Sequence, residues 1–103
     1  MNHFFAIFAT DKLGREPLRS EIRPLHREYL REPHPHRVVV RLGGPTLNGC
    51  EGAMNGTLLV VEAGSLSEAE DFFADDPYAR AGLFERVEIR PWCWGLGNPQ
   101  MGA

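Results

Sequence analysis

The sequence predicts an α+β protein with a ferredoxin-like βαββαβ order, in which a four-stranded antiparallel sheet carries two helices on one face. Three observations predict this fold class. Strand and helix patterns follow in that order, the first and third strand patterns are the most apolar, as the central strands of this fold should be, and no repeat or linker interrupts the 103 residues. Because a chain of this length has room for one core, residues 1–103 are expected to form a single domain.

The first half of the chain contains one strand pattern and one helix pattern. Residues 4–9 (FFAIFA) are apolar at every position, which is typical of a strand covered on both faces. Over residues 15–32 the apolar positions recur at helical spacing, and they are Leu18, Ile22, Leu25 and Tyr29. Pro24 lies inside this helix and removes a backbone hydrogen bond, so we expect a kink there or a helix that begins near it.

The second half supplies three strands and a second helix. The β-branched runs at 37–42 (RVVVRL) and 57–63 (TLLVVEA) predict strands, with Gly43-Gly44-Pro45 ending the first of them and residues 45–55 forming a long hairpin loop. Capping boxes that start at Ser65 and Ser67 open a helix that ends at Asp75-Asp76-Pro77. A short irregular helical turn is expected over 78–85, followed by a half-buried strand over 86–90 that continues into 91–94.

Composition and charge exclude several classes of protein. With 43% hydrophobic and 24% charged residues, the composition is that of an ordinary folded protein. A net charge of −3 offers no general attraction to phosphates, so no nucleic-acid partner is expected. The first residues lack the features of a signal peptide, and no apolar run is long enough to span a membrane. We therefore expect a cytoplasmic protein without a membrane partner.

The apolar strands predict a homodimer. In the expected fold both helices cover one face of the sheet, yet the first three strands carry apolar side chains on both faces. Soluble proteins rarely leave such a face exposed to water. A symmetric dimer that packs sheet against sheet is the simplest cover.

His26 is the first candidate for chemistry. It follows Ile22 by four residues, which places it at the edge of the apolar helix face, with Arg19 and Arg23 on the same side. Imidazole suits general acid/base catalysis because its ordinary pKa is close to neutral, and a neighbouring carboxylate can orient it. The alternative is a histidine at the margin of the core without a chemical role.

Asp76 and the arginines of the first helix also have two interpretations each. Asp76 directly precedes Pro77, which is typical of a helix N-cap, and capping does not exclude catalysis. An arginine recurs every four residues along the first helix, a pattern that could meet an anion but is more typical of a solvated face; the set is Arg15, Arg19, Arg23, Arg27 and Arg31. Only Arg23 is assigned a role, which is to hold negative charge on a ligand.

No metal site is expected. His34 and His36 are separated by one proline and have no evident third ligand, and the two cysteines are isolated from each other. The aromatic residues Tyr78, Trp92 and Trp94 could stack on a flat substrate, but large aromatics near a chain end more often seal a core or a dimer interface. The interface is favoured for these three.

Several short motifs follow one another in a specific order. They are Arg23-x-x-His26-x-x-x-Leu30, Gly43-Gly44-Pro45, Gly56-Thr57, a Ser-x-x-Glu-Ala box, Asp76-Pro77-Tyr78, Gly82-Leu83 and Arg90-Pro91-Trp92. Together they resemble the YCII-related domain family over nearly the whole chain. The resemblance implies a dimeric α/β barrel whose cleft contains a helix histidine and the aspartate of D-P-[YF], which correspond to His26 and Asp76. One branch of that family is similar to enzymes that remove chloride from hydroxylated aromatic rings.

Two functional hypotheses follow. In the first, the chain is a cofactor-free lyase or isomerase in which His26 moves a proton on a small anionic or phenolic substrate, Asp76 orients His26, and Arg23 holds charge. Tyr78, Gly44 and Pro45 would contact that substrate. In the second, a dimeric domain binds a small ligand or serves as an accessory unit without turnover. Convergence of His26 and Asp76 in a cleft, with Arg23 nearby, would favour the first hypothesis.

Overall fold

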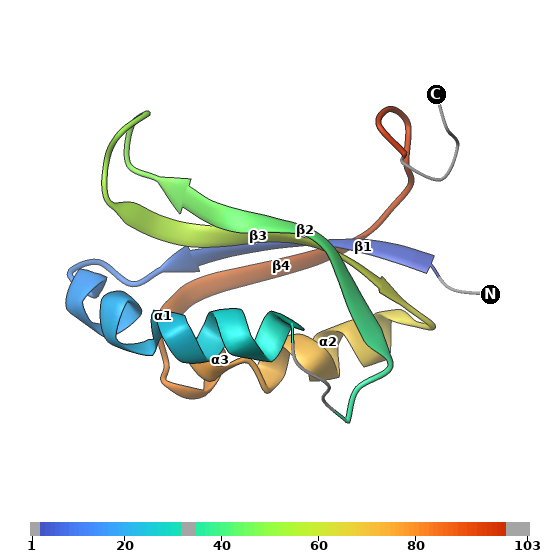
Figure 1. Cartoon of the computed structure of the whole chain (residues 1–103), viewed down its shortest axis with the longest axis horizontal. Helices are drawn as coiled ribbons and strands as arrows, with labels where there is room; N and C mark the ends of the chain where they lie inside the picture. The colour runs from blue at the N-terminus through green and yellow to red at the C-terminus, as the bar shows by residue number, and fades with distance from the viewer. Residues whose placement is uncertain (1–2, 32–34, 99–103) are drawn as a thin grey trace.

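The computed structural model describes residues 3–31 and 35–98, and Figure 1 shows their arrangement. The elements in chain order are β1 (His3–Asp11), α1 (Glu16–Arg31), β2 (Val38–Leu47), β3 (Met54–Ala63), α2 (Leu66–Ala74), α3 (Pro77–Arg80) and β4 (Phe84–Trp92). The predicted βαββαβ order is therefore confirmed, with the short helix α3 standing where an irregular helical turn was expected. No helix within the described ranges is long and apolar enough to cross a membrane.

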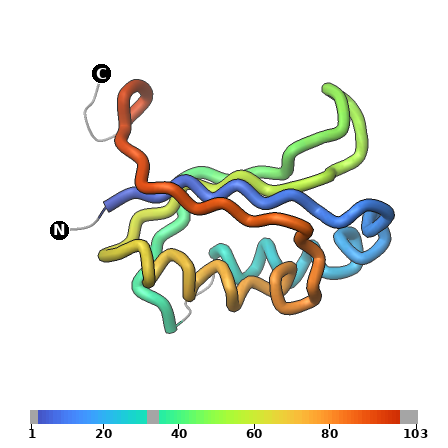
Figure 2. Tube along the Cα trace, turned by 180° about the vertical axis from the view of Figure 1, so that it is seen from behind, coloured from blue at the N-terminus to red at the C-terminus, as the bar shows by residue number. Residues whose placement is uncertain are grey.

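The four strands form one antiparallel sheet in the order β2-β3-β1-β4. The central strands are thus β3 and β1, as their apolar sequences predicted. All helices lie on one face of the sheet, which both views show (Figures 1 and 2). This is the ferredoxin-like fold.

The core lies between the sheet and α2. Ile7 of β1 is directly opposite Leu59 of β3 on one side and Ile89 of β4 on the other, so three aliphatic side chains form a row across the sheet. Phe72 and Phe73 of α2 are buried against this face. Burial of apolar side chains of this size contributes about 1.5–3 kcal/mol each, which makes α2 the helix that anchors the fold.

The β2–β3 connection differs from the prediction. Gly43-Gly44-Pro45 does not end the strand: β2 continues to Leu47 and still pairs with β3 there, for instance Gly43 with Leu59 and Pro45 with Thr57. The loop is therefore confined to residues 48–53, and the long loop predicted over 45–55 is wrong. Because β2 is an edge strand, a proline without an N–H can be accommodated there.

Helix α1 also departs from expectation. It runs from Glu16 through Pro24 without interruption, so it does not begin at that proline. Its only buried residues are Arg19 and His26, whereas Leu25, expected on the buried face, is 55% exposed. The reason is that α1 packs mainly against α3 and touches the sheet only loosely, while α2 covers β3 and β4. Polar side chains of α1 thus face a space that the apolar core does not fill.

The helix caps follow the sequence signals. The Ser65 hydroxyl accepts a hydrogen bond from the Glu68 backbone N–H at 3.1 Å and caps α2. The Asp76 carboxylate accepts one from the Tyr78 N–H at 2.8 Å and caps α3, with Pro77 in the first turn. After α3 the chain turns back at Gly82, whose φ of +73° suits glycine, and enters β4.

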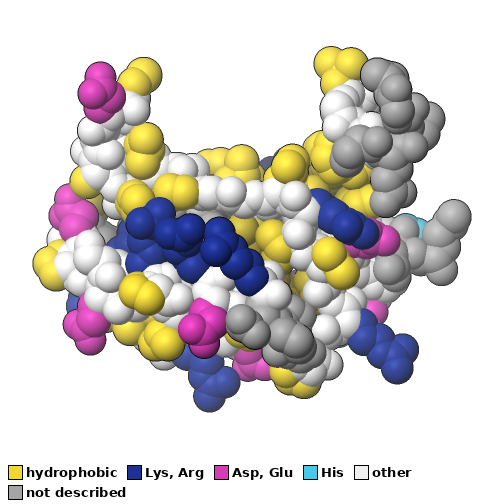
Figure 3. All heavy atoms as spheres, in the orientation of Figure 1, with side chains coloured by type: hydrophobic (Ala, Val, Ile, Leu, Met, Phe, Trp, Pro, Cys, Tyr) yellow, Lys and Arg dark blue, Asp and Glu magenta, His cyan; other side chains and the backbone are white. Residues whose placement is uncertain are grey.

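The face of the sheet away from the helices carries exposed apolar side chains. Phe8 of β1 lies directly opposite Leu58 of β3, and both are more than 40% exposed. Val39 and Leu42 of β2 extend the patch. Figure 3 shows hydrophobic side chains along this face, between the rising β2–β3 hairpin and the segment that follows β4.

Candidate active site

His26 and Asp76 meet in the structure, although they are fifty residues apart. The Nδ1 atom of His26 lies 3.0 Å from Oδ1 and 2.8 Å from Oδ2 of Asp76. Helix α1 supplies the histidine, and the N-cap of α3 supplies the aspartate, which is fully buried. The predicted proximity of these two residues is confirmed, while their role in catalysis stays a prediction.

The pairing determines which ring nitrogen of His26 is available. An ionised carboxylate only accepts hydrogen bonds, so Nδ1 must donate to Asp76 and carry the hydrogen. In neutral imidazole the Nε2 atom is then the acceptor, and it has no hydrogen-bond partner among residues 3–31 and 35–98. His26 is 7% exposed and lines a cleft, so Nε2 is the atom positioned to take a proton from a ligand.

The cleft has a volume of about 350 Å³ and lies between α1 and the inner side of β2. Its lining comprises Arg19, Arg23, His26, Arg27, Leu30 and Arg31 of α1, residues 40–45 of β2, Thr57 and Tyr78. Among the predicted site residues, Arg23, His26, Gly44, Pro45 and Tyr78 line this cleft. Asp76 does not line the cleft. Its carboxylate is connected to the cleft through its hydrogen bond with Nδ1 of His26.

Gly43 lines the cleft and packs closely on the core. A Cβ atom at this position would lie 2.7 Å from Cδ2 of Leu59, closer than van der Waals contact allows. The adjacent Gly44 has open space at the corresponding point. The Gly-Gly-Pro segment is thus a stretch of β2 with little side-chain volume, which leaves room for a ligand beside the imidazole.

Tyr78 is placed differently from the interface prediction. It is fully buried within the chain, so it does not lie at an intermolecular surface. Its ring stacks on His26, with centroids 4.1 Å apart and planes inclined by 21°. Stacking on one side and the bond to Asp76 on the other fix the orientation of the imidazole.

Arg19 is the residue that sequence reasoning passed over. It is 3% exposed, and it donates to Asp11 twice, from Nε to Oδ2 at 2.6 Å and from Nη2 to Oδ1 at 2.9 Å. It also donates from Nη2 to the Thr57 hydroxyl at 2.8 Å, and its guanidinium lies 4.4 Å from the centre of the Tyr78 ring. The signal was its spacing of seven residues before His26, two helical turns on the same face.

A second histidine pairs with the neighbouring aspartate. Nε2 of His36 lies 2.7 Å from Oδ2 of Asp75, and Oδ1 of the same carboxylate accepts from Nη1 of Arg80 at 3.3 Å. This group does not line the cleft. His34 lies outside the described residues, and residues 3–31 and 35–98 contain no group of three potential metal ligands.

The fold and the site together define the class of protein: a ferredoxin-like domain with a buried His–Asp pair beside an arginine-lined cleft. Within that class, the chain belongs to the YCII-related domain family, whose model matches residues 3–93.

Relatives and solved structures agree with this assignment. Protein YciI of Escherichia coli is 27% identical over 92 residues, which cover 85% of this chain and 94% of that protein. The 5-chloro-2-hydroxyhydroquinone dehydrochlorinase of Burkholderia phenoliruptrix, solved with 2,5-dihydroxybenzoquinone, is 31% identical with a TM-score of 0.79, over 89% of this chain and 95% of that one. A putative antibiotic biosynthesis monooxygenase from Nitrosomonas europaea shares the fold alone, at 14% identity and a TM-score of 0.51, over 94% and 100% of the two chains.

Proposed function

We propose that this protein is an acid/base enzyme of the lyase or isomerase type that acts on a small anionic or phenolic substrate and needs no cofactor. The observation that carries the proposal is the His26–Asp76 pair, in which Nδ1 is bonded to a buried carboxylate and Nε2 faces the cleft. The dehydrochlorinase similar in sequence and structure supports the same class of chemistry.

The proposed reaction begins with proton transfer to Nε2 of His26. The proton comes from an acidic O–H or C–H bond of the substrate, and the bonding electron pair stays on the substrate. Asp76 stabilises the imidazolium that forms, and Arg23 at the cleft stabilises the negative charge that develops. In a chlorinated substrate this electron pair would expel chloride, whereas in an isomerisation His26 would return the proton to another atom.

A panel of hydroxylated aromatic compounds, with and without a chlorine substituent, tests this proposal. We expect at least one chemical class to be turned over without added metal or cofactor, as measured by chloride release and by proton NMR of the products. The enzyme proposal would be contradicted if compounds of the panel bind, as detected by NMR line broadening, and none of them is converted. That outcome would favour the alternative, a small-ligand-binding or accessory domain.

We also propose that the protein forms a homodimer through the apolar face of the sheet. Phe8 and Leu58 are opposite each other on that face, and Leu42 belongs both to it and to the cleft lining. The same face of a second copy is a suitable partner, because a twofold axis packs identical patches together and an apolar patch is complementary to itself. The cleft would then lie close to the interface.

Light scattering tests the homodimer proposal because it measures the molecular mass in solution. At micromolar concentration we expect twice the 11.6 kDa chain mass. Replacing Leu58 by Lys should shift the mass to that of one chain, because a charge in an apolar interface loses its hydration without a partner. Leu25→Lys is the matched control, since Leu25 is exposed on α1, and it should leave the mass unchanged. A monomeric wild-type protein would overturn the proposal.

A further inference from the structure

The cleft carries more positive charge than one phenolic substrate requires. The four arginines of α1 that recur every four residues line it, together with Arg41 of β2. No Asp or Glu of the described residues is part of its lining. The solvated face that the sequence pattern favoured therefore holds only in part: Arg27 and Arg31 are exposed, whereas Arg19 is buried. Figure 3 shows Lys and Arg side chains gathered over the gap between α1 and the sheet.

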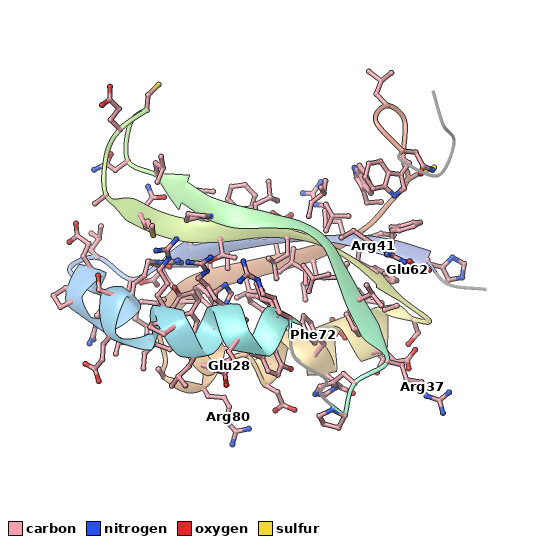
Figure 4. The ribbon with its side chains drawn as sticks, in the orientation of Figure 1. Glu28, Arg37, Arg41, Glu62, Phe72 and Arg80 are labelled. Carbon is pink, nitrogen blue, oxygen red and sulfur yellow. The ribbon has the colours of Figure 1, made fainter. Side chains whose placement is uncertain are left out.

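Only some of these arginines are neutralised within the chain. Arg19 is paired with Asp11, and Arg41 with Glu62, which Figure 4 shows side by side. Across the described ranges, Arg23, Arg27 and Arg31 form no ion pair. Glu28, the acidic residue nearest to them on the helix, lies on the side of α1 away from the sheet (Figure 4).

The unpaired arginines of α1 repel one another, and a bound anion would offset that repulsion. Like charges four residues apart on a helix repel each other and destabilise the helix. The three unpaired arginines are spaced in that way, in a chain whose net charge is −3. Because guanidinium groups bind carboxylates in a bidentate manner, the natural counter-charge is an acidic group on the ligand.

The charges lie on both sides of His26. Arg19 and Arg23 precede it on α1, and Arg27 and Arg31 follow it, with the last two exposed at the mouth of the cleft. At 1.5 Å per residue, Arg23 and Arg27 are about 6 Å apart along the helix axis. The opposite wall, residues 40–45 of β2, is apolar or bare backbone apart from Arg41, which is paired with Glu62. A flat ring with acidic groups at opposite ends matches this distribution.

Tyr78 provides an independent sign that the cleft takes a ligand. Its phenol oxygen is buried and has no hydrogen-bond partner among the residues described. Burial raises the pKa of the Tyr78 phenol, and the opposing effect of Arg19 is smaller, so the phenol keeps its hydrogen at neutral pH. A buried donor without a partner is unfavourable, and an acceptor atom of a ligand at the inner end of the cleft would pair with it.

We propose that the cleft selects a planar dianion, with one negative group held at Arg23, the other at Arg27 and Arg31, and the reacting atom beside Nε2 of His26. That the dianion is a substrate rests on the proposed function. That the site prefers two negative charges rests only on the arrangement of the arginines.

Binding measurements with terephthalate and benzoate test the charge preference without any turnover. By isothermal titration calorimetry at low salt, terephthalate should bind at least tenfold more tightly than benzoate, which corresponds to about 1.4 kcal/mol. Arg27→Gln/Arg31→Gln should abolish this preference and leave benzoate affinity nearly unchanged. Arg15→Gln/Arg86→Gln removes the same charge outside the cleft and should retain the preference.

The outcomes separate the two proposals. Equal affinity of the wild-type protein for both probes, or a preference that survives Arg27→Gln/Arg31→Gln, would overturn the dianion proposal. A preference that depends on Arg27 and Arg31 would support it even if no hydroxylated aromatic compound were converted, and in that case only the enzyme proposal would fail. Thermal unfolding of each variant verifies that the exposed arginines can be replaced without loss of the fold.

Discussion

His26→Asn is expected to reduce turnover of any substrate of this protein by about 10²–10⁴-fold, the usual contribution of a general acid or base. Asparagine keeps a similar size and polarity but cannot accept and release a proton near neutral pH. The fold should persist, because His26 lies at the edge of the cleft and outside the apolar core cluster. The measurement is kcat for the wild type and the variant, together with the melting temperature of each.

Asp76→Asn is the companion variant for this prediction. Its amide oxygen can still accept from the Tyr78 N–H, but the amide nitrogen that turns toward His26 donates where the carboxylate accepted. Nδ1 would then become the acceptor and Nε2 would carry the hydrogen, so Nε2 could not take a proton. Because the two residues act as one unit, the double variant should lose no more turnover than His26→Asn alone.

Two outcomes would contradict the catalytic role. Unchanged turnover in His26→Asn would eliminate the imidazole as the base. A large fall in melting temperature, with turnover reduced only in proportion to the unfolded fraction, would show that His26 is structural.

Arg19→Met is expected to lower the free energy of unfolding by about 3–5 kcal/mol, the usual effect of removing one partner of a buried ion pair. The substitution leaves the Asp11 carboxylate, whose side chain is 6% exposed, without its two hydrogen bonds from the guanidinium. Thr57, which is 1% exposed, loses a donor as well. Urea unfolding followed by circular dichroism measures the difference.

The double variant Arg19→Met/Asp11→Asn shows whether the cost comes from the uncompensated charge. It should recover a large part of the lost stability, because a neutral amide is far less costly to bury than a carboxylate. Arg90→Met is the matched control: it breaks the exposed pair with Glu88 and should change stability by less than about 1 kcal/mol. A loss of that small size in Arg19→Met would mean that the pair contributes little to the fold.

Much of the fold could be predicted because its signals are local. Apolar runs defined β1 and β3 as the central strands, and Ser65 and Asp76 marked the two helix starts at which they are found. The course of β2 through Pro45 was not predicted, although the predicted strand order already made β2 an edge strand, where a proline is tolerated. Propensity disfavours proline in a strand, and tertiary context overrides it here.

The site was predictable only in part. Convergence of His26 and Asp76 was expected from the resemblance to a family, because residues fifty positions apart give no local signal of contact. The buried face of α1 was assigned to aliphatic residues, and the structure places Arg19 there because Asp11 lies across from it at the end of β1. Helical periodicity shows which residues share a face but does not show what that face meets.

The double role of Asp76 restricts which residues can occupy that position. One carboxylate caps α3 through the Tyr78 N–H and accepts from Nδ1 of His26, so a replacement must satisfy both donors from one place. Serine and threonine can cap but have a hydroxyl too short to hold the imidazole, glutamate is one methylene too long to cap, and asparagine presents the wrong polarity to the ring. Mutational tolerance at position 76 is therefore the overlap of two narrow requirements, and selection for a stable helix start alone would not keep the carboxylate, because serine and threonine also cap helices.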